Sequence, residues 1–228
     1  MKKYRLLKNE SLKICGRTVY RIISLADFGD VRKGDIGGFI ESESNLSHSG
    51  RAWVGKSAVV IESAVVKDNA NVSGLAVIHG FAAVYGNASV SGGSEGRIND
   101  TPDYLNREYV EIGGFASVYD NANVRHGAKI YQYGKVFGNA KVSNRAVVKG
   151  FAEICGHSVV SGNARITDHS AVSGNAIVKG YAFLKNCAAV KGNAVVTGDA
   201  VVMGNYVLGG AKRVSKGVLS GLRNPRYL

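Results

Sequence analysis

An aliphatic residue returns at every sixth position along most of this chain, and this period constrains the fold more than any other feature of the sequence. The series begins at Val54 and runs to Val90, and after an interruption it runs from Val118 to Leu208. The two runs hold 23 aliphatic residues without a miss. A short, fixed period is typical of solenoids, in which successive turns of the chain stack on one another.

The residues around each aliphatic position predict a short strand followed by a turn. The residue two places before it is alanine in 19 of the 23 units. Alternation along a strand places both side chains on one face, and a position that accepts mainly alanine indicates that backbones lie close together there. Two places after the aliphatic, 14 units have glycine and five have Asp or Asn. These residue types tolerate the positive φ of a tight turn.

Three such six-residue units close one triangular coil, which predicts an all-β fold of stacked parallel coils. Alanine and the aliphatic residues fill the interior, and each coil buries its apolar face only against its neighbours. Residues 18 apart in the sequence should therefore stack in space. The pattern predicts two aromatic columns on the outside: Phe115, Tyr133, Phe151 and His169 in one, and Tyr119 with Phe137 in the other.

The repeat also divides the chain into regions. Residues 1–39 alternate weakly and lack the six-residue unit, so we expect a small β-rich cap over the first coil, where strand edges would otherwise be unpaired. Residues 40–210 form the β-helix, and 22 extra residues, about 91–112, leave it as a loop. Residues 211–228 hold only basic charges and are expected to form a cap or tail.

The unit A-x-V-x-G-N resembles the hexapeptide-repeat superfamily of left-handed parallel β-helices, which includes many acyltransferases. The resemblance covers roughly residues 40–210, and it implies left-handed coils and a trimer around parallel axes. The run GDIGGFIESESNLSHSGRAWV at residues 34–54 is similar to the opening of small hexapeptide-repeat proteins from phages and prophages that are labelled transferases. In this chain, however, the glycine falls one place later than in the usual unit of the family.

Composition limits the class of protein and of partner. Hydrophobic residues make up 45% of the chain without a long apolar run, which predicts a soluble globular protein and no membrane partner. The net charge of +12 raises the odds of an anionic partner. Cys15, Cys155 and Cys187 form no metal-binding pattern, and we expect reduced thiols in a cytoplasmic protein. The first residues do not resemble a secretion signal.

The predicted loop and the coils beside it hold the candidate ligand-binding residues, since long loops on rigid scaffolds often bind ligands. Aromatic rings beside a cation can stack a base and neutralise a phosphate, although stacking between coils that merely stiffens the sheet is an equal alternative. No nucleic-acid motif and no metal-ligand spacing is found. The candidates are Arg97, Tyr104, Arg107, Tyr109, Tyr119, Arg125 and Phe137.

Several outward positions near the C-terminus are apolar, which predicts an oligomer interface, and the resemblance suggests a homotrimer. These positions are Ile177, Phe183, Val195, Val201 and Val207.

Three functions follow from these patterns. The preferred hypothesis is a non-catalytic, oligomeric binding protein without a cofactor, which captures an anionic ligand such as a nucleotide, or a host protein. If the chain is phage-encoded, it would sequester a nucleotide signal or block a host defence factor. The second hypothesis follows from the resemblance: a CoA-dependent acyltransferase that takes acyl-CoA and uses His79, outward-facing and near the loop, as general base. The third is a purely structural assembly element.

Overall fold

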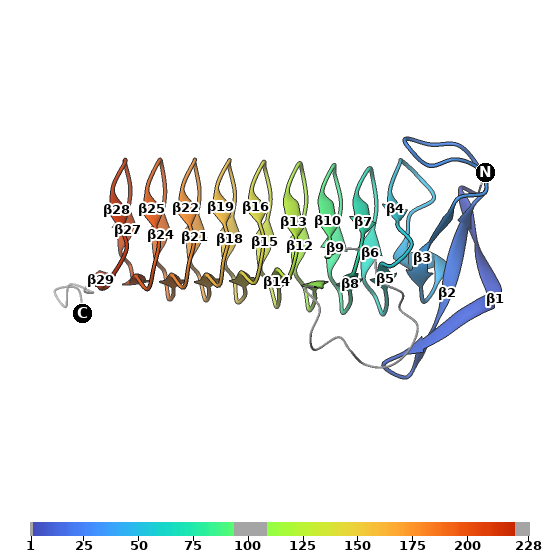
Figure 1. Cartoon of the computed structure of the whole chain (residues 1–228), viewed down its shortest axis with the longest axis horizontal. Coiled ribbons are helices and arrows are strands. Elements are labelled where there is room, and N and C mark those ends of the chain that lie inside the picture. Colours follow the sequence, from blue (N-terminus) through green and yellow to red (C-terminus); the bar gives the residue numbers. More distant parts are fainter. Residues whose placement is uncertain (1, 94–108, 222–228) are drawn as a thin grey trace, which may run out of the picture.

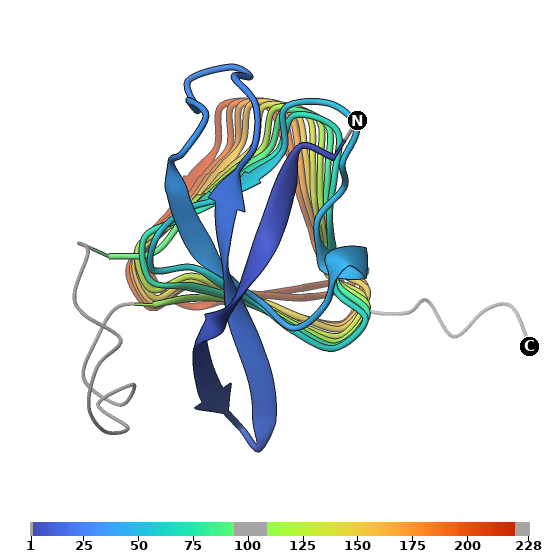
Figure 2. The ribbon, with the colours of Figure 1, turned by 90° about the vertical axis from the view of Figure 1, so that its right-hand side faces the viewer.

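The computed structural model describes residues 2–93 and 109–221, which form an all-β solenoid with an antiparallel cap at its N-terminal end (Figure 1). The solenoid has about nine coils of about 18 residues. Seen along its axis it is triangular in cross-section, as Figure 2 shows. The predicted all-β fold of parallel coils is therefore confirmed. No helix among the described residues is both long enough and apolar enough to cross a membrane.

Each side of the triangle is one sheet, and we name the sheets by their strand numbers among the described residues. The 12-stranded sheet contains β1 (Tyr4–Ile14), β2 (Arg17–Ser24), β3 (Ile36–Ile40), β5 (Val59–Val60), β8 (Ala76–Ile78), β11 (Val110–Ile112), β14 (Lys129–Ile130), β17 (Val147–Val148), β20 (Arg165–Ile166), β23 (Phe183–Leu184), β26 (Val201–Gly204) and β29 (Val218–Gly221). The 9-stranded sheet contains β4 (Trp53–Val54), β7 (Asn71–Ser73), β10 (Ser89–Ser91), β13 (Asn123–Arg125), β16 (Lys141–Val142), β19 (Val159–Val160), β22 (Ile177–Val178), β25 (Val195–Val196) and β28 (Arg213–Val214). The 8-stranded sheet contains β6 (Val65–Val66), β9 (Ala83–Val84), β12 (Ser117–Val118), β15 (Lys135–Val136), β18 (Glu153–Ile154), β21 (Ala171–Val172), β24 (Ala189–Val190) and β27 (Val207–Leu208). A short 3-10 helix, η1 (Glu43–Asn45), precedes the first full coil.

Strands of neighbouring coils pair in parallel and in register. Ile130 of β14 pairs with Val148 of β17, and Val148 pairs with Ile166 of β20. Each step along the sheet is therefore one coil of about 18 residues. The alanine and the aliphatic of each unit point inward and are fully buried, as Ala146 and Val148 are. The core is thus a continuous column of small and branched side chains, as the repeat predicts.

The turns after most strands have the predicted left-handed backbone. Gly156 has φ 69°, and Asp120 and Asp168 adopt nearly the same angle at the equivalent position. Where this residue is polar, its side chain often accepts a hydrogen bond from the backbone N–H of the next coil. Asp168 Oδ2 accepts from the N–H of Asn186 at 2.8 Å, and Gln132 Oε1 accepts from that of Gly150 at 2.7 Å. The side chain therefore links one coil to the next.

The N-terminal strands form the predicted β-rich cap. The hairpin β1–β2 is antiparallel, β2 pairs antiparallel with β3, and β3 pairs in parallel with β5 of the first coil. The hairpin projects past one side of the triangle (Figure 2). Val19 of the hairpin packs with Phe39, Val59 and Ile61 in a buried cluster on the outside of the 12-stranded sheet. The cap thus covers both the open end and the first outward residues of this sheet.

The excursion between β10 and β11 is shorter than the sequence count indicates. Val110–Ile112 forms β11, which pairs with β8 so that Ile112 lies opposite Ile78. The sequence separation of partners across the excursion is 34, whereas it is 18 elsewhere, so the excursion is one repeat unit shorter than expected. Ile112 continues the aliphatic series, but this unit has Val110 where most others have alanine, so the repeat is hard to recognise here. The expected loop of about 91–112 was therefore wrong at its C-terminal end, because residues 110–112 form a strand of the solenoid. At the other end of the chain, β28 and β29 extend the solenoid into residues 211–221.

The apolar outward residues near the C-terminus lie on different faces. Ile177 and Val195 belong to the 9-stranded sheet, Phe183 and Val201 to the 12-stranded sheet, and Val207 to the 8-stranded sheet. No one face carries all five, so the predicted interface is not a single surface. A homotrimer stays a prediction.

Candidate functional site

The outer face of the 12-stranded sheet gathers the candidate site. Every coil presents two outward side chains here, one just before the buried aliphatic residue and one just after it. His79 follows β8, and Glu111 lies in β11 of the next coil. Lys129 in β14 and Tyr131 after it belong to the coil beyond. Because the coils are in register, these residues become neighbours although they are far apart in the sequence.

Glu111 is the centre of this His79 cluster, which we define as His79, Glu111, Lys129 and Tyr131. One carboxylate oxygen, Oε1, lies 3.0 Å from His79 Nε2. The other, Oε2, accepts hydrogen bonds from Lys129 Nζ at 2.9 Å and from the Tyr131 hydroxyl at 2.7 Å. The side chains of Glu111 and Lys129 are about four-fifths buried, and that of His79 is 30% exposed. The imidazole is thus held in one orientation while part of it remains in contact with solvent.

Charge coupling perturbs the pKa values of the cluster. The hydrogen bond to Glu111 raises the pKa of His79 above its ordinary value. Burial lowers this pKa, but its effect is smaller than that of the hydrogen bond. Burial alone would raise the pKa of Glu111, but the hydrogen bonds from His79, Tyr131 and Lys129 outweigh burial and hold that pKa well below its usual range. Burial and the bond to Glu111 both raise the pKa of Tyr131. The cluster is therefore a charged network with Glu111 as its anion.

Gly113 makes room for the imidazole. A methyl group added at this glycine would overlap the His79 ring carbons and nitrogen, so the ring lies directly against the backbone of the next coil. The absence of a side chain at Gly113 is what allows His79 to turn Nε2 toward Glu111.

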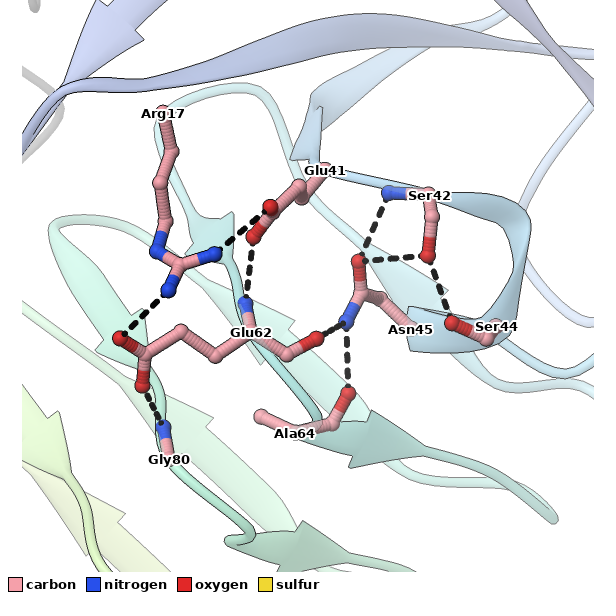
Figure 3. Close-up of polar contacts among 8 residues, drawn as sticks. All are labelled: Arg17, Glu41, Ser42, Ser44, Asn45, Glu62, Ala64 and Gly80. Carbon is pink, nitrogen blue, oxygen red and sulfur yellow. Dashed lines mark hydrogen bonds and ion pairs between the residues drawn. The ribbon is translucent and has the colours of Figure 1, made fainter.

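A second polar network connects the cap to this cluster (Figure 3). Arg17 of the cap contacts the carboxylates of Glu41 at 2.9 Å and Glu62 at 3.4 Å. Glu41 also accepts the N–H of Glu62, and Glu62 in turn accepts the N–H of Gly80 at 2.6 Å. Gly80 directly follows His79, and the charge of Glu62 contributes to raising the pKa of His79. Arg17 thus partly neutralises Glu41 and Glu62 at the start of this face.

From Lys129 onward the same face becomes basic. Four successive coils each present one cation, and we call Lys129, Lys149, Arg165 and Lys185 the cation ladder. Lys129 and Arg165 precede their aliphatic residues, whereas Lys149 and Lys185 follow theirs, so the cations alternate between two lines. Neighbouring coils are about 4.8 Å apart. The uncharged partners on the same four coils, on the opposite line each time, are Tyr131, Val147, Thr167 and Phe183.

The ladder is poorly neutralised beyond its first member. Lys129 is paired with Glu111, but within residues 2–93 and 109–221 no ion pair joins an acid to Lys149, Arg165 or Lys185. The nearby carboxylate of Asp168 is used in the turn, where it accepts hydrogen bonds from Thr167 and Asn186. The neighbouring 8-stranded sheet is different, because its Lys135 is paired with Glu153 at 3.0 Å.

The predicted ligand-binding residues do not converge on one place. Arg97, Tyr104 and Arg107 lie outside the described residues. Tyr109 is described, and its ring lies 3.1 Å from Lys129 Nζ, at the edge of the His79 cluster. Arg125 is exposed at the end of β13 on the 9-stranded sheet.

The two aromatic columns stack as predicted, and each extends one residue further back across the excursion. Tyr119 lies between Tyr85 and Phe137 with ring centroids 4.9 and 5.0 Å away. The column of Phe115, Tyr133, Phe151 and His169 gains Phe81 at its start. Both faces of the Tyr119 ring are therefore occupied, and a base cannot stack on it. This geometry matches the alternative in which aromatic residues stiffen the sheet.

Sequence reasoning missed Glu111 and the four cations of the ladder, Lys129, Lys149, Arg165 and Lys185. The repeat could have found the cations, because its phase and the three-unit coil assign each outward position to a face. Among the described residues, no group of three or more His, Cys, Asp or Glu side chains could hold a metal ion. Comparison with known protein families and with curated proteins finds no match for this chain.

Proposed function

We propose that this protein is a non-catalytic binding protein that captures an anionic ligand on the outer face of its 12-stranded sheet. The observation that carries the proposal is the cation ladder. It holds three cations without an acidic partner among the described residues, on a rigid surface that fixes their spacing. The net charge of +12 supports the same conclusion, because it attracts anions over distance.

A row of fixed cations favours a ligand with several anionic groups. A single exposed ion pair contributes only about 0.2–1 kcal/mol, so one phosphate or carboxylate would bind weakly. A ligand that engages several cations at once adds these contributions after losing its freedom of motion only once. The rigid coils help, because the backbone that carries the cations is ordered before the ligand arrives.

The test is a charge-removal experiment with a matched control. The variant K149Q/R165Q/K185Q removes three charges from the cation ladder, and K141Q/K179Q/R213Q removes three from the 9-stranded sheet. We expect the first to weaken binding of a polyanion about three- to 150-fold, from three lost contacts of the size above, and the second to change it much less. Equal losses in both variants would mean that net charge, rather than this face, binds the ligand.

Several finer assignments are proposed with it. The six-residue unit and the triangular parallel coils support membership of the left-handed hexapeptide-repeat superfamily, and the N-terminal run supports an origin in phages or prophages. A homotrimer in the cytoplasm, with a nucleotide or a host protein as the captured partner, is also part of the proposal. Sedimentation equilibrium tests the oligomeric state.

A CoA-dependent acyltransferase is the second candidate, and the oriented imidazole of His79 favours it. Glu111 holds Nε2, so Nδ1 is the nitrogen that would take the proton from the hydroxyl or amine of an acceptor as it bonds to the thioester carbon of acyl-CoA. The same nitrogen would give the proton to the CoA sulfur as the C–S bond breaks. Only the neutral imidazole can take the proton, so turnover would rise with pH through the raised pKa of His79. If H79A no longer transfers the acyl group of acyl-CoA but still binds a polyanion as wild type does, this activity is identified.

A further inference from the structure

We infer that the anionic ligand is a linear acidic polysaccharide that lies along the solenoid axis over the cation ladder. This inference rests on the proposed function and gives its ligand a chemical class. Two properties of the ladder carry it: the step between successive cations, and their alternation between two lines.

The step of the ladder fits an extended sugar chain. Neighbouring strands are about 4.8 Å apart, and each coil adds one cation. A pyranose ring joined to the next through equatorial bonds has nearly this length. In such polymers each ring is turned by about half a turn relative to the one before, so a carboxylate carried by every ring points alternately to the two sides. Lys129, Lys149, Arg165 and Lys185 alternate in the same way.

The floor between the cations also fits a sugar chain. Each cation faces an uncharged side chain across its coil, and these are Tyr131, Val147, Thr167 and Phe183. Thr167 is buried, whereas Val147 and Phe183 are partly exposed and offer apolar surface for the faces of sugar rings. Arg165 Cζ lies 5.7 Å and Lys185 Nζ 5.5 Å from the centre of the Phe183 ring. The ring therefore makes cation–π contacts with two cations of the ladder.

An acidic peptide fits this face less well. An extended peptide alternates its side chains too, but its rise is only about 3.4 Å per residue. The mismatch with the coils therefore grows by about 1.4 Å at each step, and it exceeds a hydrogen-bond length after a few residues.

Single-stranded nucleic acid fits less well for a different reason. Proteins that bind it usually combine cations with aromatic faces on which the bases stack. In the described part of the chain, the rings of the two aromatic columns stack on each other, and Phe183 has Arg165 and Lys185 beside it. On this face of the four coils of the ladder, the aromatic residues are Tyr131 and Phe183, which lie three coils apart, so successive bases have no row of rings on which to stack.

The experiment measures affinity by isothermal titration at low salt for a panel of oligomers. The test ligands are β-1,4-linked mannuronate oligomers of increasing length, which carry one carboxylate on every sugar. Hyaluronan oligomers control for spacing, because they carry a carboxylate on every second sugar only. Oligothymidylate and linear polyphosphate of equal charge represent the other classes of polyanion.

We expect mannuronate affinity to rise up to three sugars, one for each unpaired cation of the ladder, and then to level off. At equal charge, mannuronate should bind more tightly than hyaluronan, by about 1.4- to fivefold for each cation that hyaluronan leaves unpaired, and K149Q/R165Q/K185Q should remove this advantage. If oligothymidylate, polyphosphate or hyaluronan binds as tightly as mannuronate, the polysaccharide inference is wrong and the proposed function stands. If no polyanion binds, both are wrong.

Discussion

Glu111 is the residue that turns separate outward side chains into one charged network. Its two oxygens accept from an imidazole, an ammonium group and a phenol that belong to the coils on either side. The pKa of His79 is raised, so its contribution to stability is present below its ordinary value near 6.5 and is lost as the pH rises through the raised value. The pKa of Glu111 is lowered, so its contribution is present above about 4.5 and is lost as the pH falls. The pair therefore stabilises the fold most between about pH 4.5 and 6.5.

Replacing Glu111 by Gln tests this coupling. In E111Q the pKa of His79 should fall, because the largest cause of its upward shift is the hydrogen bond to the Glu111 carboxylate. Proton NMR of the imidazole through a pH titration measures the change. E153Q removes a carboxylate from the 8-stranded sheet and should leave the titration of His79 as it is. An unchanged His79 titration in E111Q would contradict the network.

Gly113 and Gly209 allow a steric test of the same contact. Both directly follow the aliphatic residue of their unit, but a methyl group at Gly113 overlaps the His79 ring, whereas one at Gly209 lies 3.6 Å from the nearest Lys191 carbon. G113A should therefore displace the imidazole and lower the pKa of His79, while G209A should not. The same imidazole titration by proton NMR measures both variants.

At the scale of the element, the turn is the unit that links coils. Gly174 has φ 68°, and a methyl group there would lie 2.9 Å from the backbone nitrogen of Gly192. Asp120 and Asp168 occupy the equivalent turn position in other coils and accept a backbone N–H of the next coil. Aspartate at this position therefore gains a hydrogen bond that offsets part of the cost of the left-handed backbone, whereas alanine gains none.

We expect G174A to lower the free energy of unfolding by about 1–2 kcal/mol or more, because a left-handed backbone disfavours a side chain. G174D should recover about 0.5–1.5 kcal/mol of this through the hydrogen bond to the next coil. Urea denaturation measures both. At Gly210, which has the same φ but no atom within 4 Å of the added methyl group, alanine and aspartate should cost about the same. If aspartate is no better than alanine at Gly174, the side chain does not link the coils.

The elements also explain which features the sequence could predict. The aromatic columns could be predicted, because a coil of constant length turns spacing along the chain into neighbours in space, as for Tyr133 and Phe151. The pairing of His79 with Glu111 could not, because it crosses the excursion, where partners are separated by 34 positions and Val110 hides the repeat. The hydrogen bonds of Glu111 depend in addition on side-chain conformations that a period does not specify.

At the scale of the whole molecule, the number of repeat units that precede a residue determines which of the three sheets carries it. Removing three repeat units removes one coil and leaves every later residue on its own sheet. Removing a single unit keeps the pattern of alanine and aliphatic residues intact but moves every later strand to the next side of the triangle. The outward residues can therefore be moved from one face to another while the inward pattern of alanine and aliphatic residues stays the same.

Two deletions of one repeat unit each use this property to test whether the cation ladder is the binding surface. Deleting residues 138–143 brings Cys155 and Ala171 to the places of Lys149 and Arg165, and Lys191 to the place of Lys185, so the face loses two cations. Deleting residues 188–193 leaves the whole ladder in place. Both proteins should fold with the same β-rich circular dichroism spectrum, since each keeps the inward pattern. The decisive measurement is their affinity for the polyanion that wild type binds best. We predict that the first deletion weakens it about two- to 30-fold, from two lost cations, and that the second leaves it near the wild-type value. Equal affinities in two folded proteins would contradict a binding surface built by the ladder.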